Sequence, residues 1–134
     1  MNGWLAIKNR KCMEIIELFF KQPTRQILKS DIIKKTKISR ATVFKCMKLL
    51  TVSNFIIETP AGNIKMYRLN LENNIVKRLK SIWSMENIKN LFEEYKDDRL
   101  EVFIFGSASR GEDLEKSDVD ILVELDYSQP IGLG

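Results

Sequence analysis

The clearest helix signal in this chain of 134 residues is the stretch Ser39-Arg-Ala-Thr-Val-Phe-Lys-Cys-Met-Lys-Leu-Leu50. Val43, Met47 and Leu50 recur at the spacing that gathers apolar side chains on one face of an α-helix. Ser39 stands before the first turn, where a serine hydroxyl accepts a hydrogen bond from a free backbone N–H. The stretch therefore predicts a capped helix that buries one face and exposes the other.

Two shorter helical patterns precede this one. Residues 11–21 repeat apolar side chains at helical spacing and are followed by Pro23, which cannot continue a helix. Residues 30–35 predict a short helix with Ser30 as its N-cap, and Thr36-Lys-Ile38 separates it from the third helix. A helix, a short helix, a tight turn and a capped third helix form the helix-turn-helix pattern.

A β-hairpin is predicted directly after the third helix. Two runs rich in β-branched and aromatic residues, 54–59 and 64–69, flank the turn sequence Pro60-Ala-Gly-Asn63. A basic hairpin in this position is the wing of a winged helix-turn-helix, and residues 11–70 resemble that DNA-binding family throughout. The resemblance implies a DNA-binding domain over residues 1–72. It also implies a homodimer, because paired half-sites in DNA match two-fold symmetry in the protein.

The polar face of the third helix and the hairpin supply candidate DNA contacts, because arginine and lysine pair with phosphates and with base edges. The candidates are Arg40, Thr42 and Lys45 for base edges or phosphates, Lys34, Lys35, Lys37 and Lys48 for phosphates, and Lys65 and Arg68 on the wing. Each single cation has a simpler explanation as a solvated surface charge. The clustering of the candidates favours the DNA interpretation.

The formal net charge of +4 hides two oppositely charged parts. Residues 1–80 contain 17 lysines and arginines and 5 acidic residues, whereas residues 81–134 contain 5 basic and 13 acidic residues. The first part therefore favours a polyanionic partner, and the split suggests two modules with different partners. A solvated, lysine-rich surface is the alternative explanation of the charge alone.

Composition excludes several function classes. The chain has no histidine, which excludes Ser-His-Asp and Cys-His triads and imidazole ligands for zinc. Cys12 and Cys46 are isolated in the sequence, and we expect both to be buried, reduced thiols. No run approaches the roughly 18 apolar residues of a membrane helix, and Trp4–Ile7 is too short for the core of a signal peptide. We therefore expect a cytoplasmic protein that does not contact a membrane.

The second half of the chain mixes helix and strand patterns. Residues 73–98 predict connector helices, and residues 99–134 predict a further domain that opens with an apolar strand. A second strand, residues 117–125, places Asp118 and Asp120 on the same face because side chains alternate along a strand. The fold class expected for the whole chain is α+β: a winged helix, connector helices and a small sheet.

The candidate chemistry lies between these two strands, in Gly106-Ser107 and, after ten further residues, Asp118-Val-Asp120. Gly106 has no Cβ and lets a phosphate approach the backbone, while Ser107 offers an anion its hydroxyl and N–H. Asp118 and Asp120 lie roughly 7 Å apart along the strand and repel each other unless a cation lies between them. Hard oxygen ligands suit Mg²⁺ or Mn²⁺. An acidic pair that is merely solvated is the alternative for Asp-x-Asp taken alone.

This arrangement resembles the polymerase-beta-type nucleotidyltransferase superfamily, in its minimal nucleotidyltransferase branch. The family pattern Gly-Ser-x10-Asp-x-Asp is matched by Gly106, Ser107, Asp118 and Asp120, and Arg110 agrees with an arginine of the family's loop. The resemblance implies that the glycine, the serine and the arginine bind a nucleoside triphosphate, with ATP as the expected substrate. It implies that the two aspartates are catalytic, bind Mg²⁺ and support transfer of AMP to an acceptor hydroxyl. Relatives in this branch are antitoxins that adenylylate HEPN-type ribonuclease toxins, so a toxin of that type is the expected partner.

The family also carries a third metal-ligating carboxylate on a later strand, and this sequence has no counterpart before Gly134. Glu124 lies about 13 Å beyond Asp120 along the strand and cannot easily replace it. We therefore expect residues 99–134 to form the first half of a nucleotidyltransferase domain. Three interpretations stay open: a fragment of a longer product, a degenerate relative that senses nucleotide or only binds partners, or a site completed by another chain. The competing hypothesis is an inactive winged-helix regulator whose remnant serves dimerisation or partner binding.

Overall fold

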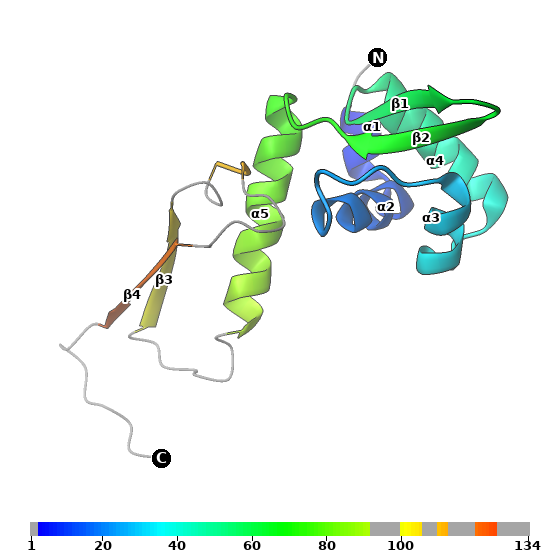
Figure 1. Cartoon of the computed structure of the whole chain (residues 1–134). Coiled ribbons are helices and arrows are strands. Elements are labelled where there is room, and N and C mark those ends of the chain that lie inside the picture. The colour runs from blue at the N-terminus through cyan, green and yellow to red at the C-terminus, as the bar shows by residue number, and fades with distance from the viewer. Residues whose placement is uncertain (1–2, 92–99, 106–109, 113–119, 126–134) are drawn as a thin grey trace. The chain divides into compact units, whose positions relative to one another are not determined.

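The computed structural model describes residues 3–91, 100–105, 110–112 and 120–125 (Figure 1). Contacts along the chain divide it into two compact units, which are Met1–Val76 and Lys77–Gly134. The first unit contains helices α1 to α4 and the hairpin β1–β2, and the second contains the hairpin β3–β4. Helix α5 begins in the first unit and continues in the second.

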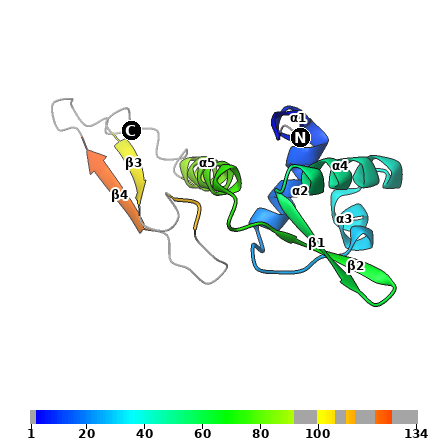
Figure 2. The same cartoon turned by 90° about the horizontal axis from the view of Figure 1, so that it is seen from above.

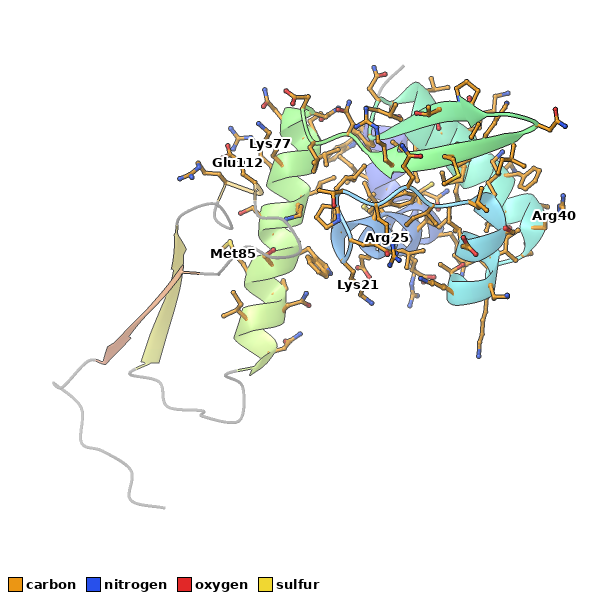
Figure 3. All side chains as sticks on the ribbon, in the orientation of Figure 1. Lys21, Arg25, Arg40, Lys77, Met85 and Glu112 are labelled. Carbon is orange, nitrogen blue, oxygen red and sulfur yellow. The ribbon has the colours of Figure 1, made fainter. Side chains whose placement is uncertain are left out.

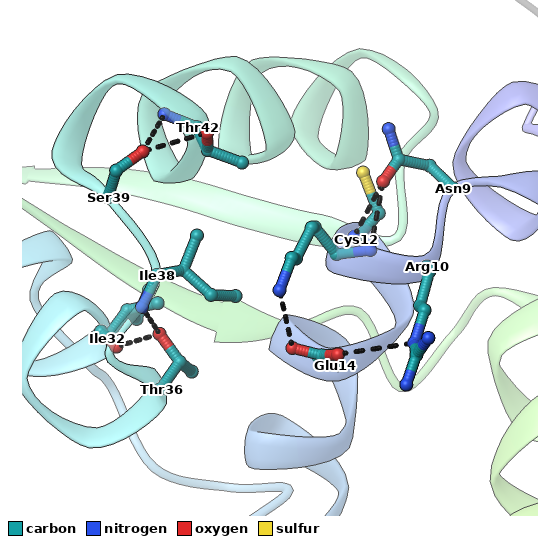
Figure 4. A network of polar contacts seen from close by, with 10 residues as sticks. Asn9, Arg10, Cys12, Glu14, Ile32, Thr36, Ile38, Ser39 and Thr42 are labelled. Atoms are coloured by element: carbon teal, nitrogen blue, oxygen red, sulfur yellow. Dashed lines mark hydrogen bonds and ion pairs between the residues drawn. The ribbon is translucent and has the colours of Figure 1, made fainter.

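The first unit opens with two helices joined by a cap. α1 spans Trp4–Lys8 and α2 spans Arg10–Phe20. Between them Asn9 has an extended backbone, and its Oδ1 accepts hydrogen bonds from the N–H groups of Lys11 and Cys12 at 3.0 and 3.2 Å (Figure 4). An asparagine in this position satisfies donors that the first turn of a helix leaves free. Asn9 therefore fixes the start of α2.

α3 spans Lys29–Thr36 and begins one residue before the predicted start. The predicted N-cap, Ser30, is wrong, because Leu28 occupies that position and no side chain caps the helix. The reason lies just upstream, where Ile27 pairs with strand β2 and leads into an extended Leu28. At the other end Lys37 has a φ of 59°, a left-handed conformation that ends a helix and makes the turn of the helix-turn-helix.

α4 spans Arg40–Val52 and is the third helix that the sequence predicts. Its predicted cap is confirmed, since Ser39 Oγ accepts a hydrogen bond from the backbone N–H of Thr42 at 3.4 Å. Val43 and Leu50 of the predicted apolar stripe are fully buried. The opposite face of α4 is therefore the one left to solvent.

The predicted wing is the antiparallel hairpin of β1, Ile56–Ala61, and β2, Ile64–Leu69. β1 begins two residues later than predicted because Asn54, directly after α4, has a φ of 62° that is incompatible with a strand. The loop of the hairpin begins at Gly62, where a φ of 65° favours glycine. Figure 2 shows this loop projecting beyond the helices of the unit.

The core of the first unit lies where α2 and α4 pack against each other and against the hairpin. Ile27 joins the hairpin as a one-residue third strand: its N–H donates to the Tyr67 carbonyl at 2.7 Å, and the Tyr67 N–H donates to its carbonyl at 2.8 Å. The largest fully buried side chains of this unit are Tyr67, Phe19, Phe55, Ile15, Ile16, Ile32, Met47 and Leu50.

In the C-terminal part of the chain α5 spans Asn74–Leu91, within the predicted connector, and residues 92–98 lie outside the described residues. β3, Leu100–Phe105, pairs antiparallel with β4, Asp120–Leu125. The strand predicted over residues 117–125 is thus described from its fourth residue onward. The predicted α+β fold class, with a winged helix followed by a helix and strands, is confirmed.

None of the helices described by the structure is both long enough and apolar enough to cross a membrane.

Candidate functional sites

The solvent-facing side of α4 carries three of the predicted contact residues together. Arg40, Lys45 and Lys48 are all exposed. The sequence from Arg40 to Val52 contains no aspartate or glutamate, so no charge on this helix opposes the three cations. All charges on the exposed face of α4 are therefore positive, and the opposite face is apolar and buried.

Thr42, the fourth residue predicted on this helix, is half-buried and takes part in its cap. The Ser39 hydroxyl donates a hydrogen bond to Thr42 Oγ1 at 2.9 Å (Figure 4). At the end of α3, Thr36 Oγ1 donates to the Ile32 carbonyl at 2.6 Å and accepts from the Ile38 N–H at 3.3 Å. These side-chain contacts hold both ends of the turn between α3 and α4, which sets the direction of the cationic helix.

Phe44 belongs to the same face and was not predicted as a functional residue. Its side chain is 40% exposed. The Arg40 guanidinium lies 5.1 Å from the ring centroid, and Lys29 Nζ lies 4.2 Å from it, within the range of cation–π attraction. The sequence did contain a signal that Phe44 is exposed. Adjacent residues of a helix lie about 100° apart around its axis, so Phe44 lies outside the buried stripe that contains Val43.

The contacts of Lys29 continue from α4 to the wing. Lys29 Nζ also lies 5.4 Å from the centroid of the Tyr67 ring on β2. The Tyr67 hydroxyl donates to Glu58 Oε1 on β1 at 2.7 Å, and Lys65 Nζ lies 3.5 Å from the same oxygen. A connected set of cations, aromatic rings and one carboxylate therefore links the first turn of α4 to both strands of the wing.

The electrostatics of this link show in two pKa values. The hydrogen bond from Tyr67, followed by the charge of Lys65, holds the pKa of Glu58 below its ordinary value, although burial acts in the opposite direction. Burial, followed by the bond to Glu58, raises the pKa of Tyr67 above its ordinary value. At neutral pH the pair is therefore a neutral phenol donating to a carboxylate.

The two predicted wing residues lie on opposite faces of the hairpin. Lys65 and Tyr67 are two positions apart on β2, so their side chains share one face of the strand, and both contact Glu58. Arg68, which pairs with Ile57, has its side chain on the other face. Lys65 is exposed and Arg68 is half-buried. The phosphate candidates of α3 and its turn, Lys34, Lys35 and Lys37, are all exposed.

In the second unit the Gly-Ser…Asp-x-Asp motif borders the described ends of strands β3 and β4 in the chain. The last residue of β3, Phe105, pairs with the first residue of β4, Asp120. Gly106 and Ser107 directly follow Phe105 in the chain, and Asp118 precedes Asp120 by two residues. Gly106, Ser107 and Asp118 lie outside the described residues, as does the side chain of Asp120. The described strand ends on either side of the motif are therefore paired with each other.

Arg110, predicted to bind nucleotide, is exposed and paired with an acidic neighbour. Its Nε donates to Glu112 Oε2 at 3.2 Å, and Lys77 Nζ on α5 lies 4.0 Å from Glu112 Oε1. Figure 3 shows the labelled Lys77 and Glu112 side chains next to each other. Gly111, between Arg110 and Glu112 in the chain, has a φ of 68°, and a Cβ there would overlap the Lys77 carbonyl. Only glycine therefore lets this segment contact the backbone of α5.

The donor types of the motif fit a hard divalent cation. Asp118 and Asp120 carry carboxylate oxygens, and Mg²⁺ is commonly held by one or two carboxylates together with the phosphates of its nucleotide. Within the residues that the structure describes, no group of three or more Asp, Glu, Cys or His residues could hold a metal ion.

Comparison with known families matches residues 85–131 to the family described as a nucleotidyltransferase domain. Met85, labelled on α5 in Figure 3, is the first matched residue. The match contains Gly106, Ser107, Asp118 and Asp120. A comparison with curated proteins gives no match.

Among solved structures, one similar chain is the homodimeric winged helix-turn-helix DNA-binding domain of a possible ArsR-family transcriptional regulator from Mycobacterium bovis. It is 16% identical, with a TM-score of 0.54, and the similarity covers 71% of this chain and 83% of that one. A possible transcriptional regulator from Methanosarcina mazei Go1 is also 16% identical, with a TM-score of 0.45 and coverage of 69% and 82%. The first likeness shows a shared fold. The chain thus joins a winged-helix fold to a segment that matches the nucleotidyltransferase domain family.

Proposed function

We propose that the first unit binds DNA by placing α4 in the major groove, with the wing against the adjacent backbone. The observation that carries this proposal is the exposed cationic face of α4, linked to the wing by Lys29 and Tyr67. A link of this kind favours a preformed interface, in which helix and wing keep their spacing before DNA arrives. The homodimeric, DNA-binding domain with the same fold supports both DNA and a second copy of this chain as partners.

The side chains of the interface have distinct expected roles. Arg40 and Lys45 are expected to reach base edges, where each cation can pair with the acceptors of guanine. Lys48 and Lys65 are expected to contact phosphates, which adds affinity but little sequence preference. Thr42 acts mainly through the cap of α4, which holds Arg40 in place.

A selection of short duplexes from a random library tests this proposal. Wild-type protein is expected to enrich one motif and to retain it, in fluorescence anisotropy, at least about 1000-fold more tightly than a scrambled duplex. Retention should also fall steeply as salt rises, because phosphate contacts release counterions. Failure to enrich any sequence would contradict sequence-specific binding.

A second function, nucleotidyl transfer, is favoured by the family match over residues 85–131 and by the pairing of Phe105 with Asp120 at the described ends of β3 and β4. We propose that ATP is the substrate and that AMP passes to a hydroxyl of a partner protein. The hydroxyl oxygen bonds to the α-phosphorus as the bond to the leaving pyrophosphate breaks, and the hydroxyl proton passes to solvent. Gly106, Ser107 and Arg110 would hold the triphosphate, and Asp118 and Asp120 would hold Mg²⁺. Bound Mg²⁺ would neutralise charge on the phosphates as the α-phosphate is attacked.

The partner proposed for this transfer is a HEPN-type toxin, which makes the chain an antitoxin that also represses its own operon. An inactive regulator is the alternative, in which the second unit only binds partners. Incubation with radiolabelled ATP, Mg²⁺ and a co-purified partner separates the two. Label on the partner that is lost in Asp118→Asn and Asp120→Asn supports the enzyme. Equal labelling by wild type and variants would assign the activity to another protein.

A further inference from the structure

A pocket of about 460 Å³ opens on the first unit, between α1, the start of α2 and α4. Leu5, Leu49 and Val52 line it, together with the thiols of Cys12 and Cys46. Burial, followed by a hydrogen bond between the two thiols, raises the pKa of Cys12 to about 12, so this thiol is uncharged at neutral pH. The volume lies within the range of about 300–1000 Å³ in which small organic ligands are bound.

Nitrogen donors stand beside this apolar surface. Lys45 and Lys48 line the pocket, and both are exposed. Asn9 lines it as well, and since its Oδ1 accepts hydrogen bonds from the N–H groups of Lys11 and Cys12, its amide is held in a fixed orientation with N–H donors to spare. The eight described residues that line the pocket include no aspartate or glutamate. Two ammonium groups, one amide and no carboxylate favour an anionic group over a neutral or cationic one.

We propose that this pocket binds a small organic anion in which an apolar ring or chain carries a carboxylate. The apolar part would lie against Leu49 and Val52, and the carboxylate would accept hydrogen bonds from Lys45 and Lys48. A second copy of the chain fits this surface less well. A two-fold contact through the pocket would bring four ammonium groups together with no acidic residue from either lining.

Anion binding would affect DNA binding through two shared lysines. This regulatory step rests on the proposed DNA function, whereas the binding of the anion does not. Lys45 and Lys48 belong both to the pocket and to the cationic face of α4. A carboxylate that holds the two ammonium groups would withdraw them from phosphates and base edges. The ligand would therefore weaken DNA binding, as an inducer does, and DNA would weaken ligand binding by the same factor.

The binding step is tested without DNA. The full chain is titrated with 1-naphthoate and with neutral 1-naphthamide, which share one ring system, and binding is followed by calorimetry. We expect one saturable site that prefers the carboxylate by about tenfold, the gain of one charge-assisted hydrogen bond. Lys45→Gln combined with Lys48→Gln should remove that preference. Lys34→Gln combined with Lys35→Gln removes the same charge from exposed residues outside the pocket and should retain it.

A further variant locates the site. Val52→Glu places a carboxylate at an exposed position of the lining, 44% accessible in the wild type, and should weaken naphthoate binding without unfolding the protein. Equal affinity for naphthoate and naphthamide would overturn the proposed selectivity. Absent binding, binding insensitive to Val52→Glu, or a dimer that Val52→Glu dissociates while naphthoate does not bind, would overturn the site.

The regulatory step has its own readout, the anisotropy of the selected duplex with and without saturating naphthoate. Weaker DNA retention with naphthoate, unchanged with naphthamide, is the expected result. Unchanged retention would overturn the inducer role while leaving the binding site in place. A protein that enriches no duplex at all would contradict the proposed DNA function, and the calorimetric result would still stand.

Discussion

The two parts of this molecule carry their function in different ways. In the first unit, function is proposed for the surface of a helix, α4, whose other face is buried in a core. In the second unit, it is proposed for the ends of two strands, at Phe105 and Asp120, where the chain leaves and re-enters a hairpin. A site on a helix surface is specified by the same periodicity that builds the core. A site at strand ends depends on the identity of a few residues and on strand register.

The largest effect is expected from the core beneath α4. Phe19 on α2 is fully buried, and Phe19→Ala should lower the free energy of unfolding of the first unit by about 3–5 kcal/mol because it leaves a cavity. The measurement is urea unfolding followed by circular dichroism. Glu17→Ala, an exposed position on the same helix, is the matched control and should change stability little. Equal stability of the two variants would mean that the packing of α2 does not support the unit.

The next effect separates the two proposed functions. Asp120→Asn should lower the rate of AMP transfer by at least about 100-fold. Loss of a residue that only hydrogen-bonds to a metal ligand costs about 10–100-fold, and loss of a proposed ligand itself should cost more. The same variant should retain DNA as the wild type does, because Asp120 lies outside the first unit. Anisotropy and labelling measured on one preparation give both values. Parallel loss of both activities would contradict the division of function.

A smaller effect is expected at Phe44, which sharpens the description of the helix surface. Phe44→Ala removes the ring that both Arg40 and Lys29 approach and should weaken specific DNA binding by roughly 0.5–1 kcal/mol, the value of an exposed cation–π contact. Phe44→Tyr keeps a ring and should restore most of the affinity. If the alanine and tyrosine variants bind alike, the ring does not position the two cations.

An effect of similarly small size concerns the wing and depends on pH. Tyr67→Phe removes the hydrogen bond to Glu58 and should cost about 1 kcal/mol of stability at neutral pH. The folded-state pKa of Glu58 is lowered, so this contribution is present above the ordinary glutamate value of 4.5 and is lost as the pH falls through the folded value. The stability difference between wild type and variant should therefore shrink below about pH 4.5. If the difference in stability between wild type and Tyr67→Phe stayed constant at acidic pH, it could not come from a hydrogen bond to the ionised carboxylate of Glu58.

Much of the first unit could be predicted because its signals are local. The apolar spacing of Val43 and Leu50 and the cap at Ser39 depend only on nearby residues, and the structure confirms them. Ser30 failed as a cap because a long-range contact decided the start of α3: Ile27 pairs with β2, about 40 residues later in the chain. Such long-range pairing cannot be predicted from local sequence patterns.

The sites show the same limit. The exposure of Arg40 and Lys45 follows from helical periodicity, whereas the contact of Lys29 with both Phe44 and Tyr67 requires three elements to meet. In the second unit the motif residues were recognised by identity, and the family match covers them. The structure also gives the register of β3 and β4, in which Phe105 pairs with Asp120. This register could not be predicted from the spacing of residues in the sequence.

The most direct test asks whether α4 is the part of the first unit that reads DNA. Arg40→Ala with Lys45→Ala removes two cations from α4, and Lys21→Ala with Arg25→Ala removes two exposed cations from elsewhere (Figure 3). The measurement is anisotropy of the selected duplex and of a scrambled duplex at several salt concentrations. We expect the α4 variant to lose its preference for the selected duplex, a cost of about 1–3 kcal/mol for each base contact, while the control keeps it. An α4 variant that still prefers the selected duplex as the wild type does would contradict the account.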